Sequence, residues 1–269
     1  MYKSYYGMNT NPFIKEETNK YPFESNDYNE VINRLNYIKE INGIGIFYGE
    51  NGLGKTYVIK SFIDSLNKDL YKIIYINSKL NSTVFDFLNN IAKELDLDTG
   101  NCYKTELTDN IQKEIIRIVT QEKMKVIVII DDAHLLKREI LLNLKILYDF
   151  EINTKDYVTL VLVGQEELKI ELSKPIHNSL KQRINTNYKL NGLSRKEVKE
   201  YISTRLEIVN SNKEIFTEEA LNTLYSCSKS SIRRLNTLII NCLMLGSQID
   251  KPVIDEEIVK LAKGEMDLK

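Results

Sequence analysis

Four short and almost uninterrupted apolar runs mark the first two thirds of the chain. They are GIGIFY (43–48), YKIIYI (71–76), KVIVII (125–130) and YVTLVLVG (157–164). Branched apolar residues are abundant in them, and such runs without polar alternation are typical of parallel strands that are covered on both faces. A shorter run, TNYKL (186–190), predicts a fifth strand that closes this region.

Between these runs, apolar residues return at three- and four-residue intervals, which is the period of an amphipathic helix. The helices expected from this pattern cover residues 55–67, 83–95, 108–122 and 138–150. Strand and helix therefore alternate, which predicts right-handed crossovers and an α/β domain built on a doubly wound, five-stranded parallel sheet. We place this domain, with an N-terminal arm, at residues 1–190.

The pattern changes after residue 190, where only helical periodicity remains. The expected helices cover residues 195–209, 217–228, 232–247 and 255–264. Ser194 and Glu197, three residues apart, fit a capping box at the start of the first of them, and Thr217 fits the start of the second more weakly. Residues 191–269 are therefore predicted to form a small all-helical domain.

The composition is that of an ordinary globular protein, with 42% apolar and 28% charged residues. Acidic residues number 38 and basic residues 37, so no overall field points to a nucleic acid or a membrane, although a local basic groove stays compatible with this balance. Cys102, Cys227 and Cys242 lie far apart, which favours reduced thiols. With no apolar signal core and no run long enough to span a bilayer, we expect a soluble, cytoplasmic protein without a membrane partner.

One glycine-rich stretch carries the clearest chemistry. GENGLGKT (49–56) matches the pattern G-x-x-x-x-G-K-T and stands between an apolar strand and an amphipathic helix, which is the setting of a phosphate-binding loop, or P-loop. Its glycines let backbone N–H groups turn towards an anion, and the helix start adds to the positive field. The residues predicted to contact ATP are Gly49, Glu50, Asn51, Gly52, Leu53, Gly54, Lys55, Thr56 and Tyr57.

Besides the P-loop, a carboxylate at the end of a buried strand is needed to hold magnesium. Asp131 supplies it directly after a run of apolar strand residues. We expect Thr56 and Asp131 to hold Mg²⁺. Asp132 follows, where many ATPases of this design have a glutamate that polarises the attacking water. Because an aspartate is one methylene shorter, either hydrolysis is slow or the local backbone compensates. His134 has the character of a local structural histidine.

Three further positions are candidates for reading the phosphates. Gln165 follows the strand predicted to lie beside the P-loop strand, where it either senses the γ-phosphate or opens the next helix. Arg183 precedes the last strand and either reaches a neighbouring subunit's nucleotide as an arginine finger or is an exposed surface charge. In the helical domain, one of Arg233 and Arg234 is expected to reach the same phosphates.

Taken together and in order, these segments resemble the AAA+ ATPases, specifically their ExeA-type branch. The resemblance rests on YYGMNTNPF (5–13), the P-loop, DDAHLL (131–136), VGQEEL (163–168), the LKQRI segment that leads into the helical domain, and SIRRLN (231–236). It implies that Gln165 is the first sensor, Arg183 the finger and Arg233 the second sensor. It also implies that Pro12 and Phe13 lie near the adenine, the alternative being simple packing of the arm.

The sequence departs from this family pattern at two places. Asp132 replaces the usual glutamate, which bears on hydrolysis but not on nucleotide binding. In the helical domain, Ser230, Ser231 and Ile232 stand where the family has glycine and proline, which bears on the position of the second sensor.

The ExeA-type branch serves two kinds of client, namely secretion pores and DNA transposition. The sequence ends directly after the helical domain, which favours stand-alone transposition ATPases of the MuB, IstB and TnsC type. This resemblance implies self-assembly on double-stranded DNA with ATP and recruitment of a transposase. Lys79 and Lys104 are candidate contacts to DNA phosphates, the alternative being solvated surface lysines. The other functions left open are assembly of a secretion or other protein complex, and a nucleotide-gated scaffold with little hydrolysis.

Overall fold

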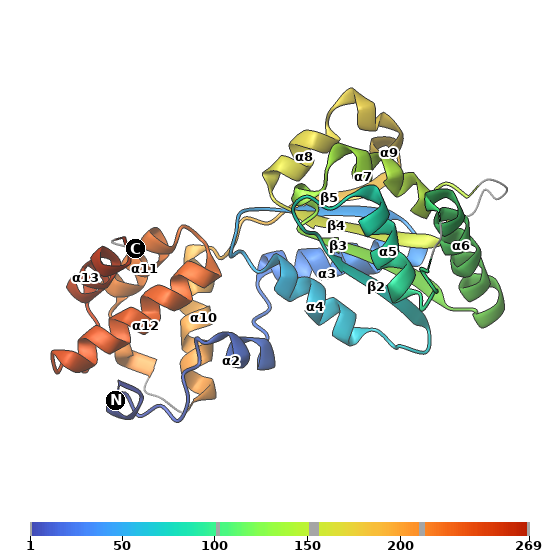
Figure 1. Ribbon diagram of the computed structural model, residues 1–269. Coiled ribbons are helices and arrows are strands. Elements are labelled where there is room, and N and C mark those ends of the chain that lie inside the picture. Colours follow the sequence, from blue (N-terminus) through green and yellow to red (C-terminus); the bar gives the residue numbers. More distant parts are fainter. Residues whose placement is uncertain (1, 101–102, 151–155, 210–212, 268–269) are drawn as a thin grey trace. The chain divides into compact units, whose positions relative to one another are not determined.

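A computed structural model describes residues 2–100, 103–150, 156–209 and 213–267, so Cys102 lies outside the described residues. Its contacts divide the chain into two compact units. The α/β unit contains Glu30–Gly49 and Lys55–Leu190, and the helical unit contains Met1–Asn29, Glu50–Gly54 and Asn191–Lys269 (Figure 1). The P-loop sequence is thus shared between the two units.

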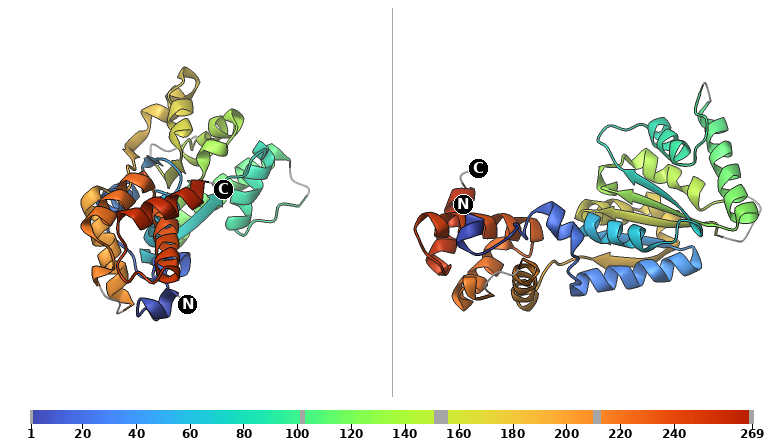
Figure 2. Two further views of the ribbon diagram at one scale, coloured as in Figure 1. Left: turned by 90° about the vertical axis from the view of Figure 1, so that its left-hand side faces the viewer. Right: turned by 90° about the horizontal axis from the view of Figure 1, so that it is seen from below.

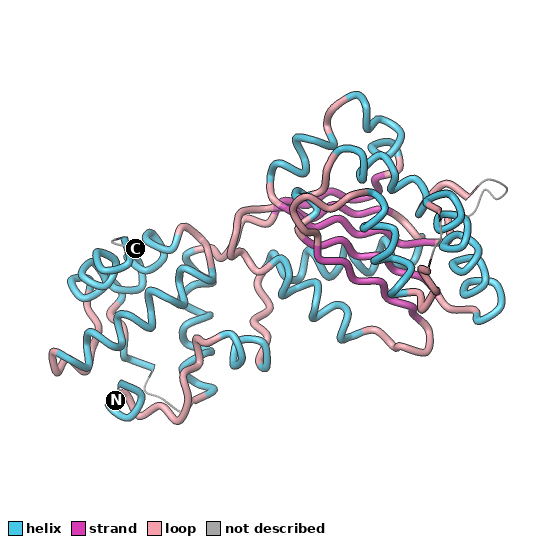
Figure 3. The backbone as a smooth tube through the Cα atoms, in the orientation of Figure 1, coloured by secondary structure: helices cyan, strands magenta, loops and turns pink. Residues whose placement is uncertain are grey.

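The α/β unit is built on one sheet of five parallel strands (Figure 3). The strands are β1 (Ile44–Tyr48), β2 (Tyr71–Asn77), β3 (Lys125–Asp131), β4 (Val158–Gly164) and β5 (Ile184–Lys189). Their order in the sheet is β2-β3-β4-β1-β5. The predicted fold class is therefore confirmed, and β5 begins two residues earlier than the sequence predicted.

Helices cover both faces of this sheet. One face carries α3 (Asn26–Ile41, within this unit from Glu30 on) and α4 (Lys55–Ser65), and the other carries α5 (Val84–Glu94), α6 (Lys104–Arg117) and α7 (Arg138–Asn143) (Figure 2). The unit also contains α8 (Glu166–Leu172) and α9 (Asn178–Gln182). All residues of β1 and β4 are buried, as the unbroken apolar runs predicted. β2, at the sheet edge, is only partly buried.

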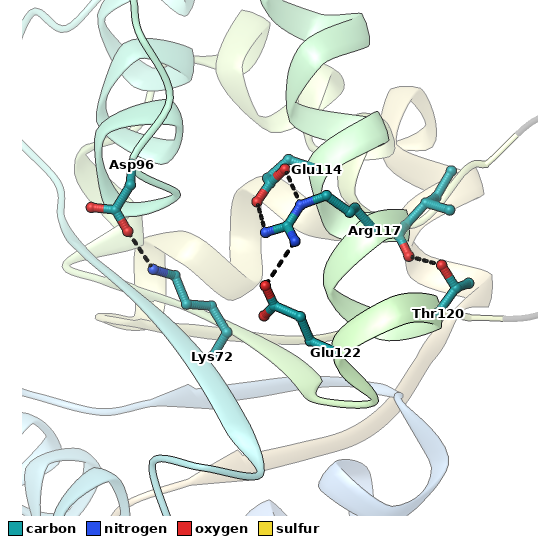
Figure 4. Close-up of polar contacts among 7 residues, drawn as sticks. Lys72, Asp96, Glu114, Arg117, Thr120 and Glu122 are labelled. Atoms are coloured by element: carbon teal, nitrogen blue, oxygen red, sulfur yellow. Dashed lines mark hydrogen bonds and ion pairs between the residues drawn. The ribbon is translucent and has the colours of Figure 1, made fainter.

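Two of the predicted helices have α-helical parts that end before the predicted last residue. The expected helix 108–122 begins at Lys104, and its last turn, Ile118–Glu122, is a wider π-helix that ends at a left-handed Lys123. The Arg117 guanidinium holds this turn because it donates to both oxygens of Glu114, at 2.8 and 2.6 Å, and pairs with Glu122 at 2.8 Å (Figure 4). The expected helix 138–150 ends at Asn143, after which the chain continues as a 3-10 turn.

The helical unit contains the four helices that the sequence predicted after residue 190. They are α10 (Arg195–Ile208), α11 (Glu218–Ser228), α12 (Ile232–Gln248) and α13 (Glu256–Asp267). The capping box of Ser194 and Glu197 is formed, and the Thr217 hydroxyl accepts from the Ala220 N–H at 3.2 Å. Nowhere in the described residues is there a helix long and apolar enough to cross a lipid bilayer.

The N-terminal arm, residues 1–29, was predicted to belong to the α/β domain. Its contacts group it instead with the helical unit. Tyr6, Met8 and Phe13 belong to the apolar core of the helical unit. Arg205, only 3% exposed, donates to the carbonyl oxygen of Tyr21 at 2.6 Å. The arm therefore supplies apolar side chains that complete a small helical core, as well as backbone acceptors for a buried arginine. It also contains α1 (Tyr2–Tyr5) and α2 (Lys15–Lys20).

Replacement of Phe13 by alanine is expected to lower the free energy of unfolding of the helical unit by about 3 to 5 kcal/mol, because it removes a fully buried ring. Chemical denaturation without nucleotide measures this loss. Ile14→Ala, next to it and 38% exposed, is the control and is expected to change the stability little. If Phe13→Ala left the unfolding curve unchanged but weakened nucleotide binding, the adenine contact implied by the family resemblance would be its main role.

Candidate nucleotide-binding site

Three segments with polar side chains meet at one edge of the α/β unit. β1 leads into the P-loop, β3 ends at Asp131, and β4 leads into Gln165. Because β4 lies between β3 and β1 in the parallel sheet, the carboxyl ends of all three strands are neighbours. In open α/β sheets this edge is the one that binds ligands.

Lys55 begins α4 directly after the glycine-rich loop. Its side chain is turned back along the loop, and Nζ donates to the carbonyl oxygen of Gly49 at 2.7 Å. Only 7% of the residue is exposed. A buried ammonium group at a helix start, where backbone N–H groups also point outwards, can bind the phosphate groups of a nucleotide.

Thr56 and Asp131 lie side by side, although 75 residues separate them. The Thr56 hydroxyl donates to Oδ2 of Asp131 at 2.7 Å, and the carboxylate is almost fully buried, with 2% of the residue exposed. A hydroxyl and a carboxylate are hard oxygen donors of the kind that Mg²⁺ prefers. The residues present therefore fit a magnesium ion, which Thr56 and Asp131 would hold.

Two more donors hold the Asp131 carboxylate. The Tyr75 hydroxyl donates to Oδ2 at 2.9 Å, and the N–H of Asp132 donates to Oδ1 at 2.9 Å. Burial of the hydroxyl, with the charge of Asp131, raises the pKa of Tyr75 well above its ordinary value, so the phenol keeps its proton. Sequence reasoning missed Tyr75. The available signal was a tyrosine hydroxyl in β2, the strand that precedes β3 and its terminal Asp131.

Asp132 stands at a backbone turn that the sequence did not predict. Its φ of 52° and ψ of 34° are left-handed, and it precedes the 3-10 turn Ala133–Leu135. Aspartate adopts this region several times more readily than most residues, because its short polar side chain can bond locally. This conformation is one that aspartate adopts readily, and the family pattern has glutamate at this position. Its side chain is 41% exposed and accessible to water.

Gln165 and His134 form a contact that links two of the predicted positions. Nε2 of Gln165 lies 2.8 Å from Nε2 of His134. Because an amide nitrogen only donates, this contact predicts that the imidazole Nε2 accepts and that the ring proton is on Nδ1, 4.0 Å from the Asp132 carboxylate. Gln165 begins α8, but its side chain makes no helix cap. Its amide is instead in contact with His134.

Arg183 lies at the amino ends of the strands, opposite to the carboxyl ends that carry the P-loop, and immediately before β5 begins. It donates to the Tyr148 carbonyl oxygen at 3.1 Å and is 3.6 Å from the Asp156 carboxylate. A parallel strand of six residues is about 20 Å long, so Arg183 is about that far from the edge that carries Lys55 and Asp131. The structure does not bring this arginine to its own chain's P-loop.

In the helical unit, residues of the P-loop contact the start of α12. Gly52 has a φ of 83°, and a Cβ there would collide with the Ser231 hydroxyl, so both its backbone and its space require glycine. The Arg233 N–H donates to the Gly52 carbonyl oxygen at 3.3 Å. Ser231, which the family pattern does not have, donates to the Asn51 carbonyl oxygen at 3.4 Å and caps α12. The structure therefore puts Arg233, rather than Arg234, in backbone contact with the loop.

The remaining predicted residues lie elsewhere. Pro12 and Phe13 are buried, and the Phe13 ring packs 6.4 Å from the Tyr201 ring within the helical core. Lys79, in the loop after β2, and Lys104, at the start of α6, are exposed. In the part of the chain that the structure describes, neither lysine forms an ion pair.

Comparisons with known proteins agree with this fold. Residues 39–170 match the family model of the AAA domain, a range that includes the P-loop, Asp131 and Gln165. General secretion pathway protein A of Aeromonas hydrophila is 29% identical over 245 residues, which are 91% of this chain and 44% of that protein. The chain thus spans less than half the length of this relative.

Solved structures that are similar in fold include the following two. Cdc6p of Pyrobaculum aerophilum superimposes with a TM-score of 0.70 at 15% identity, over 94% of this chain and 70% of that one. The Aeropyrum pernix ORC1 protein, solved in complex with DNA, has a TM-score of 0.65 at 16% identity, over 95% and 68% of the two chains. The chain has the P-loop AAA+ fold, and residues 39–170 are similar to the AAA domain.

The contact between Gln165 and His134 predicts one imidazole tautomer. We expect ¹⁵N NMR of the ring nitrogens to show His134 with its proton on Nδ1, because Nε2 accepts from Gln165. The chain has two histidines, so His177 serves as the internal reference. Gln165→Leu removes the donor and is expected to return His134 to the ordinary mixture with Nε2–H predominant. A predominant Nε2–H form in the unmodified protein would contradict the contact.

Proposed function

We propose that the protein binds ATP with Mg²⁺ and hydrolyses it to ADP and phosphate. The observation that carries this proposal is the buried hydrogen bond between Thr56 and Asp131, next to the Lys55 ammonium group at the start of α4. Residues 49–57 would cradle the phosphates through backbone N–H groups, and Lys55 would bind the terminal ones. Magnesium, when bound, would neutralise charge that develops on the phosphates during transfer.

Asp132 is the residue proposed to take a proton from the attacking water. Its carboxylate is exposed to solvent and lies at the same strand end as Asp131. Gln165, next to the P-loop strand and bonded to His134, is proposed to read the γ-phosphate. The left-handed turn at Asp132 sets where its short side chain points, and we propose slow turnover because the reach to the water is shorter than a glutamate's. Arg233 is proposed to contact the phosphates from α12.

Self-assembly is proposed because the chain's own P-loop lies at the carboxyl ends of the strands, whereas Arg183 lies at the amino ends. From there it could complete only a neighbouring subunit's site, as an arginine finger that leaves its bonds to Tyr148 and Asp156. ATP held between subunits would stabilise a ring or helical filament, and hydrolysis would loosen it. Nucleotide state and assembly would then be linked.

Mixing of two inactive variants tests the finger. Arg183→Ala and Lys55→Ala are each expected to lower ATP turnover by about 1000-fold. A one-to-one mixture is expected to recover about a quarter of the wild-type turnover, because an intact P-loop then faces an intact Arg183 at one interface in four. Lys181→Ala, at an exposed residue two positions before Arg183, is the control. A mixture as inactive as its parts would show that Arg183 does not act between subunits.

The proposed client is double-stranded DNA, on which the assembled ATPase recruits or activates a transposase. The sequence resemblance to transposition ATPases supports this role, as does the similarity in fold to an ORC1 protein solved with DNA. The exposed Lys79 and Lys104, without ion pairs in the described residues, are proposed to bind DNA phosphates. Such contacts are largely independent of sequence and weaken as salt rises.

Assembly of a protein complex, such as a secretion apparatus, is the second candidate. The 29% identity to general secretion pathway protein A over most of this chain favours it. In that case the same nucleotide switch would act on a protein partner. A scaffold with little hydrolysis differs from both in its steady-state ATP turnover.

Binding to random duplex DNA, measured with ATP, with ADP and without nucleotide, separates these candidates. Filaments or rings on DNA that require ATP, seen by negative-stain electron microscopy, are the expected result. Lys79→Glu with Lys104→Glu is expected to weaken DNA binding by about tenfold or more. Lys68→Glu with Lys93→Glu changes the same charge at other exposed sites and is the control. No DNA binding in any nucleotide state would overturn the DNA role and leave a protein client.

A further inference from the structure

We propose that Tyr75 is a positioning residue for the magnesium site, which it serves by holding the Asp131 carboxylate in one orientation. This inference rests on the proposed binding of Mg²⁺ and ATP. Tyr75 is outside the P-loop and outside the segments that carry the family resemblance. Its hydroxyl is bonded to the same carboxylate oxygen as the Thr56 hydroxyl, at 2.9 Å and 2.7 Å respectively.

The sheet brings Tyr75 to this position. β2 pairs with β3 in register, so Asn77 is opposite Asp131 and Tyr75 opposite Ile129. Side chains alternate along a strand, and therefore Tyr75 and Asp131 lie on the same face of the sheet. Ile74 and Ile76 point to the other face, into the core formed with α5 and α6. The long phenol side chain can thus reach two residues further along the strand direction, to the buried carboxylate of Asp131.

The number of donors limits what Asp131 can still do. An ionised carboxylate has about four lone-pair positions. Thr56 and Tyr75 take two of them on Oδ2, and the Asp132 N–H takes one on Oδ1. About one position then remains, on Oδ1, for a further donor or for the metal. Without the Tyr75 hydroxyl, Oδ2 would regain a free lone pair, and the carboxylate could present either oxygen.

A simple structural role for Tyr75 would lead to a different expectation. If the Tyr75 hydroxyl donated to Asp131 only because it needs a hydrogen-bond acceptor, removal of the hydroxyl would change stability, or would change nucleotide affinity equally with and without Mg²⁺. A positioning role instead changes the magnesium dependence alone. The Thr56 hydroxyl can ligate a metal through a lone pair of its oxygen while its O–H still donates to Asp131, so both hydroxyl contacts are compatible with an occupied site.

Tyr71 offers a matched control on the same strand. It is four residues before Tyr75, on the same face of β2, and at the end of the strand away from Asp131. Lys39 lies over its ring at 5.5 Å. Tyr71→Phe therefore removes a phenol hydroxyl from the same strand and face without touching the site.

The test is the binding of a fluorescent ATP analogue, titrated with Mg²⁺, to wild type, Tyr75→Phe and Tyr71→Phe. Tyr75→Phe is expected to raise the Mg²⁺ concentration at half-maximal enhancement of binding by at least about fivefold, because a hydrogen bond to a charged group is lost. Affinity for the analogue without Mg²⁺ is expected to stay unchanged, and Tyr71→Phe to match wild type in both measurements. Thermal unfolding without nucleotide confirms that each variant is folded.

Two results would overturn the role of Tyr75 while leaving the proposed function in place. One is a Mg²⁺ midpoint of Tyr75→Phe equal to that of wild type. The other is an equal loss of affinity with and without Mg²⁺. If wild type itself bound no nucleotide, or bound it without regard to Mg²⁺, the proposed function would fail, and the inference with it. The wild-type titration alone identifies this case, and Asp131→Asn is the reference for complete loss, because it should abolish the magnesium dependence that wild type shows.

Discussion

A buried carboxylate at the end of β3 sets the strictest condition on this structure. Burying an ionised group is costly unless donors surround it, and Asp131 is 2% exposed. Its three donors come from the start of α4, from the middle of β2 and from the turn after β3 itself. The P-loop helix, the edge strand and the strand end must therefore come together in one arrangement. A fold that misplaced any of them would leave a buried charge without a partner.

The parallel sheet separates the two ends of the α/β unit chemically. At the carboxyl edge lie Lys55, Asp131, Asp132 and Gln165, and at the amino edge lies Arg183. This separation follows from strand direction alone and not from the details of packing. In a protein built this way, the proposed phosphate-binding groups and the proposed finger arginine lie on different surfaces. Assembly with a second copy is the arrangement in which both could act on one nucleotide.

The helical unit depends on the N-terminal arm to complete its core. Its core is small, and the N-terminal arm adds Tyr6, Met8 and Phe13 to it. The two terminal nitrogens of the buried Arg205 guanidinium donate to arm carbonyl oxygens, so the arm and α10 depend on each other. Part of the P-loop belongs to this unit by its contacts, through Gly52 and the start of α12. Ser231, a departure from the family pattern, takes part in that contact.

The sequence by itself determined the elements whose signal is local. The unbroken apolar runs specified the strands, the glycine pattern specified the P-loop, and Ser194 with Glu197 specified a helix start. Only the tertiary structure decided what depends on pairing and packing between distant segments. The contact of Tyr75 with Asp131 requires the β2–β3 register, and the contact of His134 with Gln165 requires the order of β3 and β4. The arm's place in the helical unit depends on which apolar faces were left uncovered. Periodicity along one segment reports its own conformation and burial, whereas partners are chosen by the surfaces of the other segments.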